Sequence, residues 1–275
     1  MLVWGEGGDL KLNYFILSYN KPDKISTLEM LHSYGIYDDV YVVAGYDDPS
    51  LEEYRKLDNS LIFDKDLIAN KVDSIGTYAK TLRLCTYARV FVDEYAKEHN
   101  MKYVCILFDD IMSVEIRYRD GEYIRSSRDF DLKKALSYYA ELLELNEHIY
   151  MTGPPGSSFY IGSKPGRENE TCSHYANILI YDVTKPLIPY KASVMEDMYI
   201  VLSNSVIGHI GLFPFGLQVN CRPSKITNEA YKGVSNSEYI QQYAILSGTV
   251  SANADNMIVP YNRYIPRIVS GRYKK

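Results

Sequence analysis

Two adjacent carboxylates, Asp109 and Asp110, directly follow the apolar run YVCILF. Neighbouring like charges repel, so these side chains must either point into water or meet a positive charge. A divalent cation such as Mg²⁺ or Mn²⁺ supplies that charge and binds carboxylate oxygens together with the phosphates of a ligand. Because successive strand residues point to opposite faces, both carboxylates can serve one ligand only if the chain turns there. A surface acidic pair or a helix cap is the alternative.

A second acidic pair, Glu196 and Asp197, lies in the segment ASVMEDMYIVL. At a helix start it would be stabilised by the macrodipole, which is a purely structural role. A partly desolvated carboxylate beside a bound substrate can instead remove a proton from a hydroxyl group. His209, in the segment IGHIG, is a candidate further metal ligand, with a packed or exposed histidine as the alternative.

Hydrophobic patterning predicts the elements that position these residues. The apolar runs YFILSYN, VYVVAG, LIF and YVCILF alternate with helical patterns at STLEMLHSYG, PSLEEYRKL and residues 77–99. This alternation predicts a parallel sheet with helices on its faces. Ser26 and Ser50 each precede a glutamate by three residues, as in a capping box, and Gly35 is placed as a helix C-cap. In the long helix, Arg89 is free to face away from the core.

Ligands of such sheets bind beyond the carboxyl ends of the strands. Five polar residues follow the predicted strands: Asn20, Asp47, Asp48, Asp109 and Asp110. Their convergence at one edge of the sheet predicts a ligand site there.

The second part of the chain has a mixed pattern. Alternating residues around Asp120 and Gly121 predict a hairpin, and DLKKALSYYAELLEL predicts an amphipathic helix. ANILIYDV and GLFPFGLQV are expected to be extended, and VMEDMYIVLSNSVIG is expected to be helical. Without a repeat or an obvious linker, we expect one domain over residues 1–275.

Composition and charge narrow the class of protein. The 275 residues are 46% hydrophobic and 24% charged, which is typical of a soluble globular protein. Without a run of about 20 apolar residues or a signal-peptide pattern, we expect a cytoplasmic protein with no membrane contact. The four scattered cysteines are expected to be reduced. No G-x-G-x-x-G, P-loop or G-x-S-x-G motif occurs, which argues against the common dinucleotide, NTPase and hydrolase templates.

The charge is unevenly distributed along the chain. The net charge is −5, yet the segment from Cys221 onward has eight Lys or Arg residues against three Asp or Glu residues. Tyrosine, of which the chain has 27, is frequent in this segment too. An anionic partner at this end is one interpretation, and a solvated terminus is the other.

Four of these segments resemble motifs of glycosyltransferases with the GT-A fold. YFILSYNKPDKISTLEML and VYVVAGYDDPSLEEYRKL resemble the first two strand–helix units, VCILFDDI the acidic metal motif, and VMEDMYIVL the late acidic pair. The chain is more narrowly similar to the TET-associated glycosyltransferases of phages, which are expected to glycosylate hydroxymethylated pyrimidines in DNA. The resemblance covers about the first 110 residues, with a weaker similarity near Glu196.

The resemblance implies metal-dependent transfer of a sugar from a nucleotide-sugar donor to a hydroxyl acceptor. It implies donor-binding roles for Ser18, Asn20, Lys21, Asp47, Arg83 and Asp109. It assigns Mn²⁺ or Mg²⁺ to Asp109 and Asp110, a UDP-sugar as the donor, and the role of acceptor-activating base to Asp197 with Glu196. Phe108 occupies a position at which the family has an acid, so the ligand set is short.

The resemblance also divides the domain into three parts. Residues 1–112 would form the nucleotide-sugar-binding half, residues 113–220 the acceptor half, and residues 221–275 a basic, tyrosine-rich extension. With DNA as the acceptor, the extension would contact its phosphates through Arg222, Lys225, Arg263, Arg267 and Arg272. The rival hypotheses are a glycan, lipid-linked or protein acceptor, a sugar-nucleotide nucleotidyltransferase, and a non-catalytic nucleic-acid or sugar-binding module. The oligomeric state stays open.

Overall fold

The computed structural model describes residues 10–72, 85–120, 123–155, 171–172, 177–187, 200–201, 204, 207–214, 216–222, 256–260 and 266–270. Within these ranges, eight strands form one sheet in the order β3-β2-β1-β4-β9-β7-β10-β8. The strands are β1 (Leu12–Leu17), β2 (Val40–Gly45), β3 (Ser60–Phe63), β4 (Tyr103–Phe108), β7 (Ile149–Thr152), β8 (Thr171–Cys172), β9 (Ile178–Asp182) and β10 (Ile210–Pro214).

The first four strands form a parallel half-sheet, as the sequence predicts. β1 pairs in parallel with β2 and with β4, and β2 pairs in parallel with β3. Leu17 lies opposite Val43 of β2 and Phe108 of β4, so these strands end at one edge. β9 is antiparallel to β4 and to β7, whereas β10 is again parallel to β7. The predicted α/β class, with a mostly parallel sheet, is confirmed.

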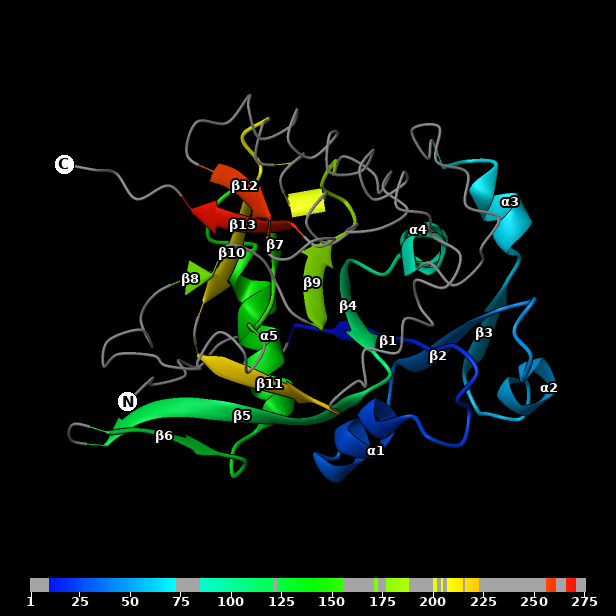
Figure 1. Cartoon of the computed structure of the whole chain (residues 1–275), viewed down its shortest axis with the longest axis horizontal. Coiled ribbons are helices and arrows are strands. Elements are labelled where there is room, and N and C mark those ends of the chain that lie inside the picture. The colour runs from blue at the N-terminus through cyan, green and yellow to red at the C-terminus, as the bar shows by residue number, and fades with distance from the viewer. Residues whose placement is uncertain are drawn as a thin grey trace.

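Helices cover both faces of this sheet (Figure 1). They are α1 (Ser26–Ser33), α2 (Leu51–Tyr54), α3 (Lys65–Ala69), α4 (Cys85–Glu98) and α5 (Leu132–Leu142). Apolar side chains of α1, α2 and α5 share one core cluster with Tyr14 and Ile16 of β1. Those of α3 and α4 share a second cluster with Phe15 and Leu17. The alternation along β1 therefore fixes which helices lie on each face.

A second, three-stranded sheet in the described part of the chain continues directly from the first. It has the order β11 (Leu217–Cys221), β5 (Ile111–Asp120) and β6 (Tyr123–Ser127). The antiparallel pairing of β5 with β6 confirms the hairpin predicted at Asp120. Only Asp109 and Asp110 separate β4 from β5, so the acidic pair forms the turn that joins the two sheets. β12 (Asn256–Pro260) and β13 (Pro266–Ser270) pair as a further hairpin.

Several local predictions for the helices are wrong. Neither α1 nor α2 has a side-chain cap, so the capping boxes at Ser26 and Ser50 do not form. Tertiary hydrogen bonds to Arg222 and Asn20 engage the two serine hydroxyls instead. Arg89, expected to face away from the core, is buried in α4. Gly35 follows α1 with a φ of +74°, which confirms its C-cap role.

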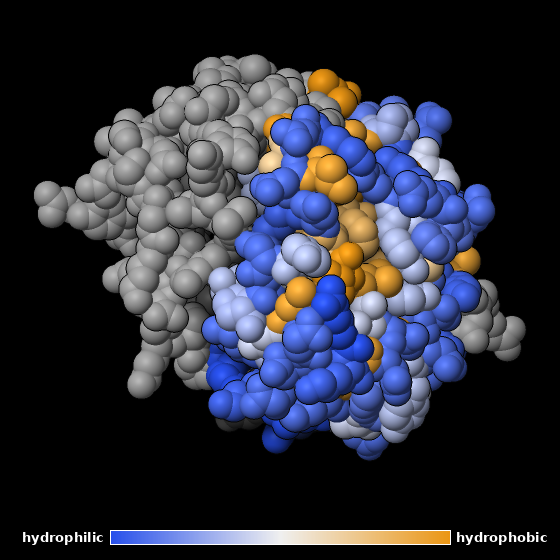
Figure 2. Space-filling view, turned by 90° about the vertical axis from the view of Figure 1, so that its right-hand side faces the viewer, coloured by the Kyte–Doolittle hydropathy of each residue, from blue (hydrophilic) through white to orange (hydrophobic). Residues whose placement is uncertain are grey.

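Among the described strands, β3 is the edge strand of the parallel half-sheet. The side of the molecule that carries β3, α2 and α3 is largely hydrophilic, with apolar side chains gathered in a strip across its middle (Figure 2). Leu61 and Ile62 of β3 are half-buried, and Leu67 of α3 is exposed. A strand of four residues offers few unpaired backbone groups to another chain. No helix among the described residues is long and apolar enough to span a bilayer.

Candidate active site at the acidic turn

The start of α1 fixes the turn formed by Asp109 and Asp110. The buried Thr27 donates its backbone N–H to the carbonyl of Asp109 over 3.3 Å. Its hydroxyl donates to the carbonyl of Phe108 and accepts the N–H of Ile111 over 3.0 Å. Because the chain turns here, the two carboxylates are not confined to opposite faces of one strand, which is the condition predicted for binding a single ligand.

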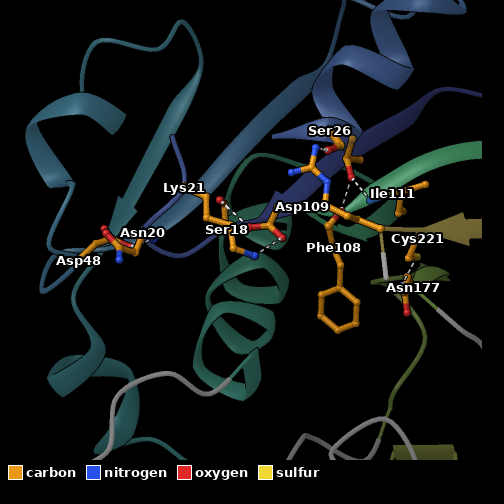
Figure 3. A network of polar contacts seen from close by, with 12 residues as sticks. Ser18, Asn20, Lys21, Ser26, Asp48, Phe108, Asp109, Ile111, Asn177 and Cys221 are labelled. Carbon is orange, nitrogen blue, oxygen red and sulfur yellow. Dashed lines mark hydrogen bonds and ion pairs between the residues drawn. The ribbon is translucent and has the colours of Figure 1, made fainter. Parts of the chain in front are cut away.

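The carboxylate of Asp109 is buried and has a partner on each oxygen (Figure 3). Ser18 Oγ, just after β1, donates to Oδ2 over 3.0 Å. Lys21 Nζ lies 3.5 Å from Oδ1, and the Lys21 side chain is 55% exposed. The structure therefore brings three predicted site residues together and gives Asp109 a counter-charge from the protein itself.

Asp110 has a different environment from Asp109. Its Oδ1 is buried and has no hydrogen-bond partner among the described residues. Burial and the charge of Asp109 raise the pKa of Asp110, against the opposing effects of Lys21 and Arg222. An unpaired, desolvated carboxylate oxygen is a suitable ligand for a hard cation. Asp110 therefore fits a metal role better than Asp109 does.

The end of β11 brings a second basic residue to this turn. The backbone N–H of Arg222 donates to the carbonyl of Asp110 over 2.8 Å, and its Nη2 donates to Ser26 Oγ over 2.9 Å. Arg222 is exposed and pairs with no carboxylate in the described part of the chain. Beside it, Cys221 Sγ accepts a hydrogen bond from Asn177, and burial together with the charge of Asp110 raises the pKa of this thiol to about 12. Cys221 is therefore a neutral neighbour of the turn.

Asp47 and Asp48 follow β2 and lie beside the loop after β1. Lys65 Nζ approaches the two carboxylate oxygens of Asp47 at 2.8 and 2.9 Å. Gly45 leaves room for this ion pair, since a Cβ there would lie 2.5 Å from Lys65 Cε. Asp48 is buried and accepts the backbone N–H of Asn20 over 2.9 Å. The structure therefore brings Asn20 to the β2 end, as predicted, through its contact with Asp48.

Tyr54, in α2, is a site residue that sequence reasoning missed. Its ring is fully buried, and its hydroxyl lies 2.7 Å from Ser18 Oγ and accepts the N–H of Lys21 over 3.1 Å. Nothing in the sequence distinguishes Tyr54 from the other tyrosines. Thr27 and Asn177 were missed for the same reason, since their roles depend on partners far along the chain.

His209 does not join the acidic turn, and its prediction as a ligand beside Asp109 and Asp110 is wrong. It immediately precedes β10, which runs in the same direction as β4, so it lies at the opposite edge of the sheet. Its ring stacks on that of Tyr150 with the ring centroids 3.6 Å apart, and its Nδ1 lies at hydrogen-bond distance, 3.1 Å, from Asn204 Oδ1. Burial and the charge of His148 lower its pKa.

Phe108 stands where the resemblance leads one to expect an acid. The ring of Phe108 points away from Asp109 and lies 5.3 Å from the guanidinium carbon of Arg89 (Figure 3). In the part of the chain that the structure describes, no cluster of three His, Cys, Asp or Glu residues could hold a metal.

Six predicted site residues lie outside the described residues: Arg83, Glu196, Asp197, Lys225, Arg263 and Arg272. Arg267 lies on β13, but its side chain is not described. Of the predicted DNA contacts, Arg222 is the one that the described structure positions beside the acidic turn.

No protein-family model and no curated protein matches this chain. Solved structures with a similar chain path include glucosyl-3-phosphoglycerate synthase from Mycobacterium tuberculosis in complex with Mn²⁺, UDP-glucose and phosphoglyceric acid. It is 8% identical, with 96% of this chain and 88% of that chain covered and a TM-score of 0.46. TarS from S. aureus is 12% identical, with 90% of this chain and 71% of that chain covered and a TM-score of 0.42. A cytidylyltransferase from Leptospira borgpetersenii is 14% identical, with 89% of this chain and 95% of that chain covered and a TM-score of 0.38.

Proposed function

We propose that this chain is a metal-dependent glycosyltransferase that moves a sugar from a nucleotide-sugar donor, a UDP-sugar, to a hydroxyl acceptor. The observation that carries the proposal is the unequal environment of the two aspartates at the carboxyl edge of the sheet. Asp109 is bound by Ser18 and Lys21, whereas Asp110 has a buried oxygen without a hydrogen-bond partner in the described structure. Exposed basic residues, Lys21 and Arg222, contact this turn. A carboxylate oxygen can bind a divalent metal ion, and nearby basic side chains can bind the diphosphate that accompanies the ion.

The residues of the turn fit Mn²⁺ or Mg²⁺. Asp110, together with Asp109, would hold the ion, and one or two carboxylates suffice when phosphates and water complete the coordination. Such an ion stabilises the charge that develops on a departing nucleoside diphosphate. Lys21 would donate hydrogen bonds to its phosphate oxygens. Ser18 keeps Asp109 oriented toward Lys21.

The nucleotide is proposed to lie over the ends of β1 and β2. Asn20 and Asp47 occupy these ends and are assigned to the nucleotide, with Arg83 assigned to its base or diphosphate. The ion pair with Lys65 holds the Asp47 carboxylate at the end of β2. An ion-paired carboxylate keeps free lone pairs and can still accept hydrogen bonds from a ribose or base.

The transfer step is assigned to Asp197 with Glu196. In this proposal Asp197 takes the proton of the acceptor hydroxyl, and the acceptor oxygen forms a bond to the anomeric carbon. The bond from that carbon to the diphosphate breaks, and its electron pair leaves with the nucleoside diphosphate. The protein residues thus supply the base and the phosphate contacts.

For the acceptor, we propose hydroxymethylated pyrimidine in phage DNA. Arg222 supports this, because it begins the basic extension and contacts the acidic turn through Asp110. A phosphate backbone held by Arg222 and the residues after it would pass beside the reacting centre. A salt titration of binding to single-stranded DNA tests this part, since each phosphate contact steepens the salt dependence. Absence of DNA binding at low salt would leave a glycan or another non-DNA acceptor.

The activity is tested with the purified chain, MnCl₂ and a panel of nucleotide sugars, with and without DNA that contains hydroxymethylated pyrimidines. We expect release of nucleoside diphosphate from one donor, transfer of the sugar to the modified DNA, and loss of both with EDTA. Unmodified DNA of the same sequence is the matched acceptor control. Asp110→Asn should abolish turnover, whereas a binding module would tolerate it. Failure to bind or consume every nucleotide sugar would refute the proposed function.

A further inference from the structure

The hydroxyl of Tyr54 is the origin of a directed hydrogen-bond chain that ends on Asp109. A carboxylate only accepts, so the bond of 3.0 Å between Ser18 Oγ and Asp109 Oδ2 uses the proton of Ser18. The bond of 2.7 Å between Ser18 and Tyr54 must then use the proton of Tyr54. The Tyr54 oxygen in turn accepts the backbone N–H of Lys21 over 3.1 Å. Tyr54 therefore connects both ends of the loop Ser18–Lys21 to the acidic turn.

A second contact holds the same loop from its other side. Asp48, which is 5% exposed, accepts the N–H of Asn20 over 2.9 Å and that of Ser50 over 2.8 Å. The hydroxyl of Ser50 also donates to Asn20 Oδ1 over 3.0 Å. Asn20 has a φ of +53°, a left-handed conformation that is uncommon for non-glycine residues and that asparagine tolerates better than most. Such a conformation persists where its surroundings fix it, and Asp48 and Ser50 do so here.

We infer that Tyr54 and Asp48 are positioning residues that fix the loop Ser18–Lys21 for binding of the donor diphosphate. The inference rests on the proposed function for its ligand, and on the hydrogen bonds for its mechanism. Neither side chain would contact the donor, because Tyr54 is fully buried and Asp48 nearly so. They act through Ser18, which orients Asp109, and through Lys21, whose exposed ammonium group would meet the phosphates.

Because Tyr54 is buried, its hydroxyl remains a hydrogen-bond donor to Ser18. Burial raises the pKa of Tyr54, so the hydroxyl keeps its proton throughout the pH range in which the protein would work. A phenylalanine at this position keeps the buried ring and removes the hydroxyl alone. The N–H of Lys21 then loses its acceptor, and Ser18 loses the donor that aligns it with Asp109. The loop should become mobile while the core stays packed.

The test compares Tyr54→Phe with Tyr139→Phe. Tyr139 is equally buried in α5 and donates to the carbonyl of Pro214 over 3.0 Å, remote from the loop in sequence and fold. Amide hydrogen exchange of the wild type and both variants is measured by NMR at Lys21. We expect exchange about tenfold faster in Tyr54→Phe and unchanged in Tyr139→Phe, since one hydrogen bond is lost. Unchanged exchange in Tyr54→Phe would overturn the inference.

Binding of UDP with MnCl₂, measured by calorimetry, tests the functional half. The dissociation constant should rise about tenfold in Tyr54→Phe and stay unchanged in Tyr139→Phe. Faster exchange with unchanged UDP affinity would refute the positioning role. If the wild type binds no nucleotide while Lys21 exchanges faster in Tyr54→Phe, the anchoring of the loop stands and the proposed function fails.

Asp48→Asn keeps the inference testable if Tyr54→Phe folds poorly, and Ser18→Ala extends the test if it folds well. Asp48→Asn replaces one of the two acceptor oxygens by an amide group, so it should loosen Asn20 and weaken UDP binding in the same way. Ser18→Ala breaks the same chain one bond closer to Asp109. The effects of Ser18→Ala and Tyr54→Phe on the UDP dissociation constant should be less than additive, because both act through one path. Additive effects would show that Tyr54 does not act through Ser18.

Discussion

Replacing Asp110 by asparagine should stabilise the protein while it removes metal binding. In the native state, Asp110 Oδ1 is buried without a hydrogen-bond partner in the described structure, next to the charge of Asp109. Asparagine keeps the shape of the side chain and removes the charge of Asp110, which Lys21 and Arg222 offset only in part, and each unit by which a pKa is raised corresponds to about 1.4 kcal/mol. We therefore expect Asp110→Asn to raise the free energy of unfolding by about 1 kcal/mol. For a chain of this size, that is about 2–4 °C in melting temperature.

The pH dependence of this gain has a definite sign. The pKa of Asp110 is raised in the folded state, so folding favours the protonated form. The destabilisation that ionised Asp110 causes is therefore absent below its pKa in the unfolded chain, about 3.9, and it develops as pH rises through its pKa in the folded protein. The difference between Asp110→Asn and the wild type should be close to zero near pH 4, about the unfolded pKa, and largest at neutral pH.

Thermal melts of the wild type and Asp110→Asn across this pH range measure the effect. The exposed Asp38→Asn is the matched control for loss of one negative charge. Added MnCl₂ and UDP should raise the melting temperature of the wild type and not that of Asp110→Asn, because ligand binding to the native state alone stabilises it. Lower stability of Asp110→Asn at neutral pH would show that the carboxylate is satisfied in the native protein, and the metal argument would fall with it.

Three further substitutions separate the roles around the turn. Lys21→Met should weaken UDP–Mn²⁺ binding about tenfold in calorimetry and should lower the melting temperature, because it leaves the buried Asp109 carboxylate without its counter-charge; Lys24→Met, at an exposed lysine just after the loop, should change neither. Thr27→Val should lower the free energy of unfolding by about 2 kcal/mol in a urea titration, since it leaves the carbonyl of Phe108 and the N–H of Ile111 unpaired. Thr152→Val, which removes a buried hydroxyl bond elsewhere, should lower stability without affecting UDP binding. His209→Ala should leave the Mn²⁺ dependence of UDP binding unchanged, and a loss would return His209 to the metal site.

The parallel half-sheet could be predicted because its strands carry strong local signals. VYVVAG is an uninterrupted apolar run, and β2 covers the same six residues. Alternation of strands and helices then fixes the strand direction, and direction alone brings the residues after β1, β2 and β4 to one edge. Ser18, Lys21 and Asp109 meet for this reason. No knowledge of their contacts was needed to expect them together.

The wrong predictions concern residues whose partners are distant in sequence. The Ser26 hydroxyl accepts from Arg222, 196 positions away, and local capping rules do not include that competitor. His209 looked equivalent to other polar residues beside strands. The direction of β10 turns it to the opposite edge, and no local pattern states that direction. Tyr54 has the same difficulty, because its importance comes from hydrogen bonds to the loop after β1.

The acidic pair shows why residue type and spacing predict a site before they predict its chemistry. From the sequence, Asp109 and Asp110 are equivalent, and a single cation is the simplest answer to their repulsion. In the folded chain the loop after β1 supplies Ser18 and Lys21 to Asp109, whereas β11 supplies only backbone contact and a nearby charge to Asp110. The protein neutralises one carboxylate with its own ammonium group, and an oxygen of the other has no hydrogen-bond partner among the residues that the structure describes. That asymmetry arises from the three-dimensional arrangement of two sheets, and it makes Asp110 the residue whose substitution tests the proposed site most directly.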